Sequence, residues 1–169
     1  MSSKVLFVDD EPHVTEALKR ALRKEPYEVL SAGSARDALR VLSEQPIDVV
    51  VSDERMPGMS GSEFLAQVAD AYPDTIRIIL TGHATMETAV RAINEGRVYR
   101  FMTKPVNEMD LVVTIRRALQ HKEVMIKAAK LEKIARQQRT ALEDLERRYP
   151  GITSIKTDAK GTIVLDDEG

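Results

Sequence analysis

Short apolar runs that alternate with amphipathic stretches constrain the fold of this chain more than any other feature. Four continuous, β-branched runs lie at residues 5–8, 48–51, 76–80 and 98–102, and a weaker fifth run covers 27–31. Continuous runs of this length are typical of strands covered on both faces, as in a parallel sheet. We therefore predict five strands in one buried sheet.

Helical patterns fill the intervals between these runs. Pro12 opens the first pattern, where its missing N–H loses no hydrogen bond, and Ser34 is a suitable N-cap for the second. The third covers roughly 61–71 and the fourth 85–95. Strands that alternate with helices predict a doubly wound α/β sheet, whose right-handed crossovers place helices on both faces.

The last helical pattern begins near Asn107 and continues past the point where a fifth crossover helix should stop. No Pro or Gly interrupts the chain from His121 to Tyr149, and this part is charged and rich in Ala, Glu, Lys, Arg and Gln. We therefore predict three regions, which are a folded domain (1–120), a helical arm continuous with the fifth helix (121–149) and a short tail (150–169).

The arm carries about four heptads, which is the lower limit for a coiled coil. Ala135 and Gln138 make the middle of the seam small or polar, so we expect weak or register-sensitive pairing. A single solvated helix held by salt bridges, such as Glu132 with Arg136, is the alternative. The seam residues are His121, Ala128, Ala135, Leu142 and Tyr149 at one core position and Val124, Leu131, Gln138 and Leu145 at the other.

Pro150 and Gly151 end the arm. The tail alternates weakly around a turn at 158–161, so it is either a small hairpin or the start of a longer region.

Composition excludes several kinds of protein. The 169 residues include no cysteine, which rules out disulfides and thiolate metal sites, and the formal charge of −2 attracts the chain neither to nucleic acid nor to an anionic membrane. The apolar run 5–8 is too short for a signal peptide or a membrane span, so we predict a cytoplasmic protein.

Polar side chains stand where the predicted strands end. In an open α/β sheet, side chains just past the carboxyl ends of the strands converge on one crevice. A single Asp at a strand end is usually a turn or cap residue, but the whole set in order is hard to obtain by chance. The set is Asp9 and Asp10 after the first strand, Asp53 after the third, Thr81 after the fourth and Lys104 after the fifth.

Three clustered carboxylates repel one another unless a cation is present. Mg²⁺ prefers oxygen ligands and suits one or two carboxylates together with a substrate phosphate. Asp53 is central in the predicted sheet and is placed to attack a phosphoryl group, giving an aspartyl phosphate. Lys104 would offset charge on the phosphoryl oxygens, and Thr81 can reach the phosphate once it is present.

Four segments together resemble those of response regulator receiver domains, and the resemblance covers residues 4 to about 120. It implies a flavodoxin-like fold with the five-stranded order 2-1-3-4-5. The segments are Val8-Asp9-Asp10-Glu11-Pro12, Ser52-Asp53-Glu54-Arg55-Met56-Pro57-Gly58-Met59-Ser60-Gly61, Leu80-Thr81-Gly82 and Phe101-Met102-Thr103-Lys104-Pro105.

The resemblance also assigns a role to each matched position. Phe101 falls where many relatives carry Tyr, so a hydroxyl contact is lost there and only burial remains. The implied roles are Asp53 as phosphoacceptor, Asp9, Asp10, Asp53 and the backbone carbonyl of Arg55 as Mg²⁺ ligands, Thr81 and Lys104 as phosphate-sensing groups, Phe101 as the switch aromatic, and Pro105 as the site of a cis peptide.

Arg55 and His83 lie two residues past Asp53 and Thr81. We predict that they flank the phosphoryl group and influence how easily water attacks it; two ordinary surface residues are the alternative. His13 and His121 have no kinase-like setting, so the phosphodonor is expected to be a separate sensor histidine kinase.

These observations predict a phosphorylation-dependent switch that signals through its arm, as a homodimer, without a catalytic output, direct DNA binding or membrane insertion. A scaffold that dimerises or recruits a partner independently of phosphorylation is the alternative. An aspartyl phosphohydrolase of the haloacid dehalogenase type places its nucleophile after the first strand and a second acid two residues later. This class is disfavoured because Asp9-Asp10-Glu11-Pro12 lacks that arrangement and no cap domain is available. A flavin carrier is disfavoured because acids replace the phosphate-cradling loop.

Overall fold

A computed structural model describes residues 2–152, 156–157, 160 and 163–164 of the chain. These residues form two compact units, 1–124 and 125–169, and the long helix α5 runs from one into the other. In chain order the elements of the first unit are β1 Ser3–Val8, α1 Pro12–Ala21, β2 Tyr27–Ala32, α2 Ala35–Glu44, β3 Val49–Ser52, α3 Gly61–Ala71, β4 Ile76–Thr81, α4 Met86–Asn94, β5 Arg100–Thr103 and the beginning of α5 Glu108–Arg148.

The five strands of the first unit form one parallel sheet in the order β2-β1-β3-β4-β5, so the predicted fold class is confirmed. The interior strands β1 and β3 carry the apolar runs 5–8 and 49–51, whose side chains are at most 2% exposed. The weaker run 27–31 became the edge strand β2, where most side chains are only half-buried. An edge strand buries less of its side-chain surface, so the sequence of β2 is less apolar than that of the interior strands.

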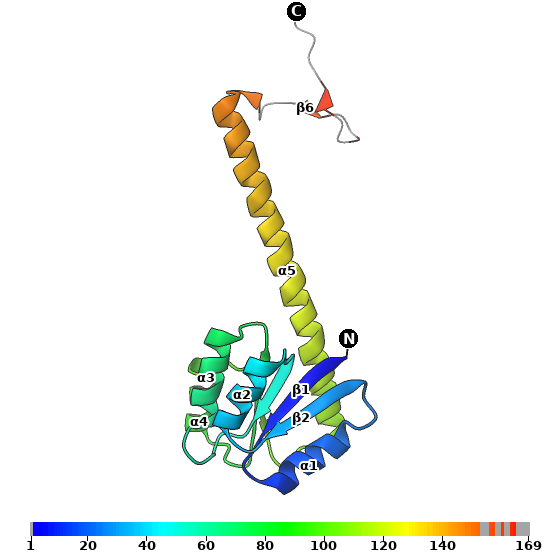
Figure 1. Ribbon diagram of the computed structural model, residues 1–169, viewed down its shortest axis with the longest axis vertical. Helices are drawn as coiled ribbons and strands as arrows, with labels where there is room; N and C mark the ends of the chain where they lie inside the picture. The colour runs from blue at the N-terminus through cyan, green and yellow to red at the C-terminus, as the bar shows by residue number, and fades with distance from the viewer. Residues whose placement is uncertain (1, 153–155, 158–159, 161–162, 165–169) are drawn as a thin grey trace, which may run out of the picture. The chain divides into compact units, whose positions relative to one another are not determined.

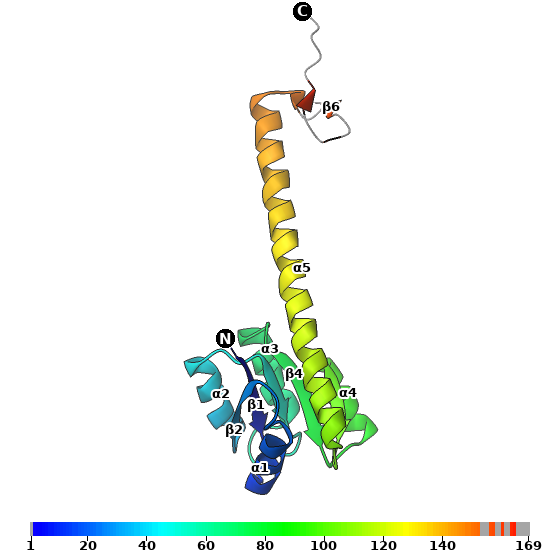
Figure 2. The same ribbon diagram turned by 90° about the vertical axis from the view of Figure 1, so that its right-hand side faces the viewer.

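Helices cover both faces of the sheet and enclose two separate cores (Figure 1). On one face α2, α3 and α4 pack through Leu42, Phe64 and Ala92. On the other face α1 and the first turns of α5 pack through Leu18 and Ile115 (Figure 2). This arrangement follows from the right-handed crossovers between parallel strands, and it leaves the carboxyl ends of the strands free of helices.

The fifth strand begins later than its apolar run predicted. The run covers 98–102, whereas β5 is Arg100–Thr103. Val98 packs against the core under α2–α4 and Tyr99 against the core under α1 and α5, so both are apolar without belonging to the strand. Arg97, with a φ of 49°, makes the turn that leads into them.

Within the first unit, α5 is held by polar contacts as well as by its apolar face. Arg116 pairs with Glu25 at 2.7 Å, and Lys122 pairs with Asp48 at 2.7 Å. The His121 ring stacks on Tyr99 with centroids 4.9 Å apart. His121 therefore contacts the first unit, and the predicted seam from His121 to Tyr149 stays a prediction.

The second unit contains the rest of α5 and part of the tail. Side chains of the seam such as Leu131, Leu142 and Leu145 are exposed on the single chain. The Glu132–Arg136 pair of the single-helix alternative is present at 3.8 Å, although both side chains are exposed and such a pair adds little stability. Beyond Gly151, which has a φ of 92°, β6 Lys156–Thr157 pairs antiparallel with β7 Ile163–Val164.

This pairing corresponds to the hairpin alternative for the tail, but most of the predicted turn at 158–161 lies outside the described residues. None of the helices in the described part of the chain combines the length and the apolar character needed to cross a membrane.

Candidate functional site

Backbone hydrogen bonds continue past the strand ends and align the predicted site residues. The Asp53 N–H donates to the Val8 carbonyl at 2.9 Å, and the Lys104 N–H donates to the Thr81 carbonyl at 2.9 Å. The Asp9 N–H donates to the Ala32 carbonyl at 3.1 Å. The sheet ladder therefore sets the positions of these residues at its carboxyl edge.

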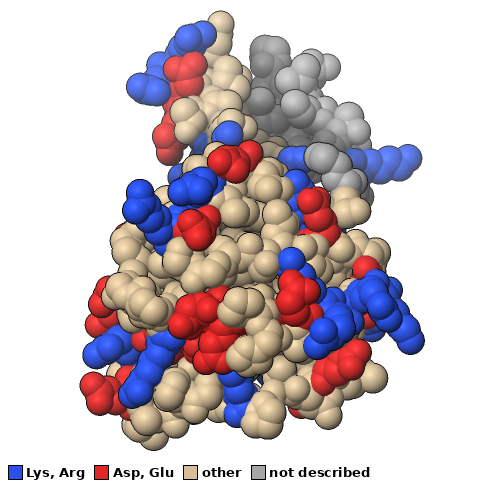
Figure 3. All heavy atoms as spheres, turned by 60° about the horizontal axis from the view of Figure 1, so that its bottom comes forward, with Lys and Arg blue, Asp and Glu red and all other residues tan. Residues whose placement is uncertain are grey.

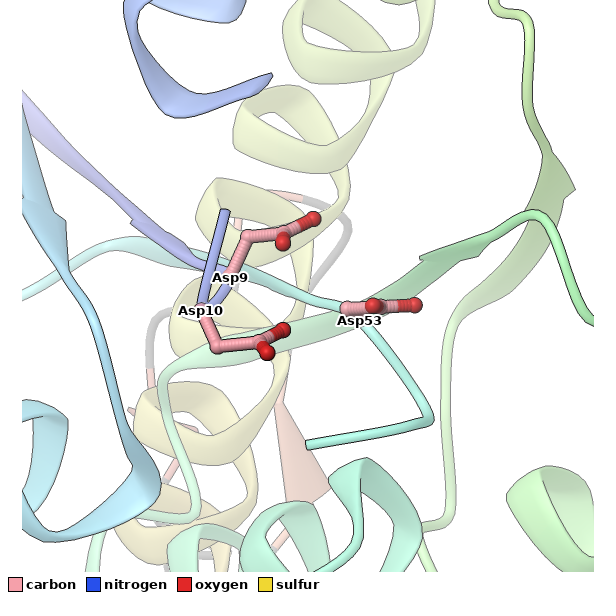
Figure 4. A group of neighbouring side chains, drawn as sticks. All are labelled: Asp9, Asp10 and Asp53. Carbon is pink, nitrogen blue, oxygen red and sulfur yellow. The ribbon is translucent and has the colours of Figure 1, made fainter. Parts of the chain in front are cut away.

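Asp9, Asp10 and Asp53 meet at this edge. Each offers one carboxylate oxygen, and the three oxygens lie within 4.8 Å of one another. The Asp9 and Asp10 side chains extend from the end of β1 toward Asp53 at the end of β3 (Figure 4). Asp9 and Asp53 are buried and Asp10 is exposed. In the space-filling view of this edge, acidic side chains gather amid largely uncharged atoms (Figure 3).

Fixed donors orient the two buried carboxylates. The Glu11 N–H donates to Asp9 Oδ1 at 3.0 Å, and the Glu54 N–H donates to Asp53 Oδ1 at 2.9 Å. The second oxygens face Lys104, whose Nζ is 2.7 Å from Asp9 Oδ2 and 3.7 Å from Asp53 Oδ2. The ammonium therefore offsets part of the repulsion between the two acids.

The loop after Asp53 is fixed by the N-terminus of α3. The Gly61 N–H donates to the Glu54 carbonyl at 2.9 Å, and the Ser62 N–H donates to Glu54 Oε2 at 3.1 Å. A Cβ on Gly61 would lie 2.1 Å from the Asp53 carbonyl oxygen, so only glycine permits this approach. The phosphoacceptor candidate thus sits on a backbone segment that the first turn of α3 holds in place.

Glu54 is a residue that the sequence reasoning missed. Its side chain is buried, and Oε2 also accepts a hydrogen bond from the Ser62 hydroxyl at 2.7 Å. Burial raises the pKa of Glu54, while the Ser62 hydrogen bonds and the charge of Arg91 oppose the rise. A charged residue in a loop is expected to be exposed, and no pattern around position 54 signals its burial.

The other predicted site residues lie around this centre in different settings. Thr81 is fully buried at the end of β4, and its Oγ1 accepts a hydrogen bond from the His83 N–H at 3.1 Å. Phe101 is half-buried and packs against the core under α2–α4. The side chains of Arg55 and His83 are exposed, so their predicted influence on water attack stays a prediction. The Lys104–Pro105 peptide is cis, as predicted.

The donor set fits a magnesium ion. Mg²⁺ binds carboxylate oxygens and retains several waters, and this site supplies three carboxylates with one exposed member through which water can enter. The residues that would hold the ion are Asp9, Asp10 and Asp53. The backbone carbonyl of Arg55 stays a predicted further ligand.

A five-stranded 2-1-3-4-5 sheet with an acidic cluster, a hydroxyl and a lysine at its carboxyl edge defines the class of phosphoreceiver proteins. The family model for the response regulator receiver domain matches residues 5–116, and the chain belongs to this family.

Individual relatives agree with this assignment. The hydrogenase transcriptional regulatory protein HoxA of Cupriavidus necator is 38% identical over 116 residues, which cover 69% of this chain and 24% of HoxA. The signal receiver domain of an HD domain-containing protein from Pseudomonas fluorescens Pf-5 superposes with a TM-score of 0.72 at 33% identity, covering 75% of this chain and 93% of that one. The beryllofluoride-activated NtrC4 receiver domain dimer superposes with a TM-score of 0.66 at 34% identity, covering 70% of this chain and 98% of that one.

The chain spans about a quarter of the length of the curated relatives it matches. HoxA is named a transcriptional regulator, which does not fit our expectation of a response regulator without direct DNA binding. The match, however, covers residues of this chain that form the receiver domain.

Proposed function

We propose that this chain is a phosphorylation-dependent switch in which Asp53 accepts a phosphoryl group from a sensor histidine kinase. The observation that carries the proposal is the buried Asp53 carboxylate among Asp9, Asp10 and Lys104. When bound, Mg²⁺ would offset the negative charge that develops on the transferred phosphoryl oxygens.

Asp53 would supply the attacking oxygen, and Lys104 would stabilise the transferred phosphoryl group. Asp53 Oδ1 is held by the Glu54 N–H, which leaves Oδ2 on the side of Lys104 for attack on phosphorus. Lys104 would exchange part of its contact with Asp9 for the new phosphoryl oxygens, because they carry more negative charge.

Thr81 and Phe101 would transmit the change. In the present structure the Thr81 hydroxyl accepts from the His83 N–H, so it is engaged within its own loop. A phosphoryl group on Asp53 would offer Thr81 a stronger, charged acceptor and draw the loop after β4 toward β3. The half-buried Phe101 would then repack, and the surface of α4, β5 and α5 would change.

The output would pass through the arm. Because α5 is one helix from Glu108 to Arg148, a change at its receiver end can alter how its exposed seam pairs with a second copy. A homodimer is therefore part of the proposal, as is the absence of a catalytic output in this chain.

Labelling by a small phosphodonor tests the proposal. With Mg²⁺ present, the wild type should be labelled to about one phosphoryl group per chain, and Asp53→Asn should not be labelled. Asp74→Asn, an exposed acid on the loop before β4, is the matched control and should be labelled like the wild type. Equal labelling of Asp53→Asn, or labelling without Mg²⁺, would refute the proposal. Absence of labelling in the wild type would favour the scaffold alternative.

A further inference from the structure

One buried oxygen next to the phosphoacceptor has no protein partner. Among the residues whose side chains the structure describes, Glu54 Oε1 is the buried side-chain oxygen that accepts no hydrogen bond. The other oxygen of the same carboxylate accepts two hydrogen bonds from Ser62. A buried polar atom that lacks a hydrogen-bond partner destabilises the folded state. A hydrogen-bond donor that can reach this oxygen should therefore bind it.

Glu54 is one of the residues that line a cavity of about 600 Å³ between the loop that follows β3 and the N-terminal half of α4. Arg91 on α4 lines the same cavity. The positive charge of Arg91 opposes the rise in the pKa of Glu54.

The Arg91 side chain makes only a weak ion pair in the present structure. Its Nη2 lies 3.7 Å from Glu87 Oε1, one turn earlier on α4, and both side chains are exposed. A solvent-exposed pair of this kind contributes little free energy, so its exchange for another partner has a small cost. Glu54 would become the more favourable partner once activation shifts α4, because its Oε1 is buried and accepts no hydrogen bond in the present structure.

We propose that Arg91 leaves Glu87 and pairs with Glu54 Oε1 when the receiver is activated, so that this contact latches α4 to the loop that carries Asp53. The proposal rests on the proposed function, because it concerns the activated state of the same site. The Arg91–Glu54 ion pair would connect α4 directly to the residue that follows Asp53. This connection would act in addition to the movement of Thr81 and the repacking of Phe101. The neighbouring Thr85–Thr88 capping box can remain intact, since it involves neither residue.

A double-mutant cycle with beryllofluoride and Mg²⁺ tests the latch. The full chain is titrated with beryllofluoride, and the half-response concentration is read from the amide NMR signals around Thr81. Arg91→Gln should raise this concentration about tenfold in the wild-type background, as expected for the loss of one hydrogen bond between charged groups. In the Glu54→Gln background the same substitution should change it less than about twofold.

Equal effects of Arg91→Gln in both backgrounds would overturn the latch. If Glu54→Gln does not fold, Glu87→Gln supplies an independent test. By releasing Arg91, it should lower the half-response concentration severalfold, and an unchanged or higher value would overturn the proposal. Arg97→Gln, which removes a surface arginine that pairs with Asp70, is the matched control and should leave the titration unchanged.

The same titration separates the two proposals. A wild type that shows no response to beryllofluoride and Mg²⁺ would contradict the proposed switch itself. A wild type that responds, with additive effects of the Glu54 and Arg91 substitutions, would contradict only the latch.

Discussion

Lys104 and Asp9 are 95 positions apart in the sequence, yet the Lys104 Nζ lies 2.7 Å from Asp9 Oδ2. The contact joins the ends of β5 and β1, which are not neighbours in the sheet, across the end of β3 where Asp53 stands. One lysine thus contacts both buried acids of the site, and its charge determines how strongly the site attracts a cation.

Removal of the Lys104 charge should therefore strengthen metal binding while it impairs switching. In Lys104→Met we expect Mg²⁺ affinity to rise about fivefold, because one nearby positive charge no longer opposes the ion. Phosphoryl labelling of Asp53 should persist, but the NMR response around Thr81 should be lost. Isothermal titration with Mg²⁺ measures the first effect, and a weakened affinity would contradict the electrostatic role given to Lys104.

Mg²⁺ should stabilise the folded chain through the three carboxylates. At a Mg²⁺ concentration about ten times the Kd, linkage predicts a gain of about 1.4 kcal/mol in the free energy of unfolding. Asp10→Asn should reduce this gain, because it removes the exposed ligand. Thermal unfolding with and without Mg²⁺ measures the effect, with Asp74→Asn as control. An equal gain in Asp10→Asn would exclude that residue from the metal site.

Gly61→Ala should damage both the fold and the site. The added Cβ would meet the Asp53 carbonyl oxygen at 2.1 Å, so α3 must move away from the loop after β3. We expect a loss of about 1–3 kcal/mol or more in the free energy of unfolding, and weaker Mg²⁺ binding. Gly33→Ala, where a Cβ meets nothing within 4 Å, should change stability by less than about 0.5 kcal/mol. Similar denaturation midpoints for the two variants would argue against this role of Gly61.

Arg55 and His83 should influence the lifetime of the phosphoryl group on Asp53. Both side chains are exposed and each lies two residues past a site residue, so they are placed to affect the approach of water. We expect Arg55→Ala or His83→Ala to change the dephosphorylation rate at least about threefold, or ~0.7 kcal/mol in the barrier. Loss of radiolabel over time measures the rate, and wild-type lifetimes in both variants would make them ordinary surface residues.

The arm should mediate dimerisation through its seam. The exposed Leu131 lies on the seam, so Leu131→Asn should weaken the dimer at least about tenfold, because each dimer loses two buried leucines. Ile126→Asn, an exposed apolar residue off the seam, is the matched control and should have a small effect. Sedimentation velocity over a range of concentrations measures both. A wild type that stays monomeric throughout would favour the single-helix alternative.

Much of the fold could be predicted because its information is local in the sequence. Continuous β-branched runs indicate buried strands, and alternation with helical patterns indicates parallel pairing. Once parallel strands are assumed, Asp9, Asp53 and Lys104 must share one edge, since the carboxyl ends of such strands lie together. The strand order 2-1-3-4-5 was implied by the family resemblance, and the sheet confirms it.

Other features depended on contacts between distant segments, which no local pattern records. Glu54 is buried where the first turn of α3 docks on it, and the His121 ring stacks on Tyr99 from the segment before β5. The sequence alone determined which strands and charged groups exist and at which edge of the sheet they meet. The tertiary structure decided which of those charges are buried and paired, because burial and pairing are set by the packing of whole elements against one another.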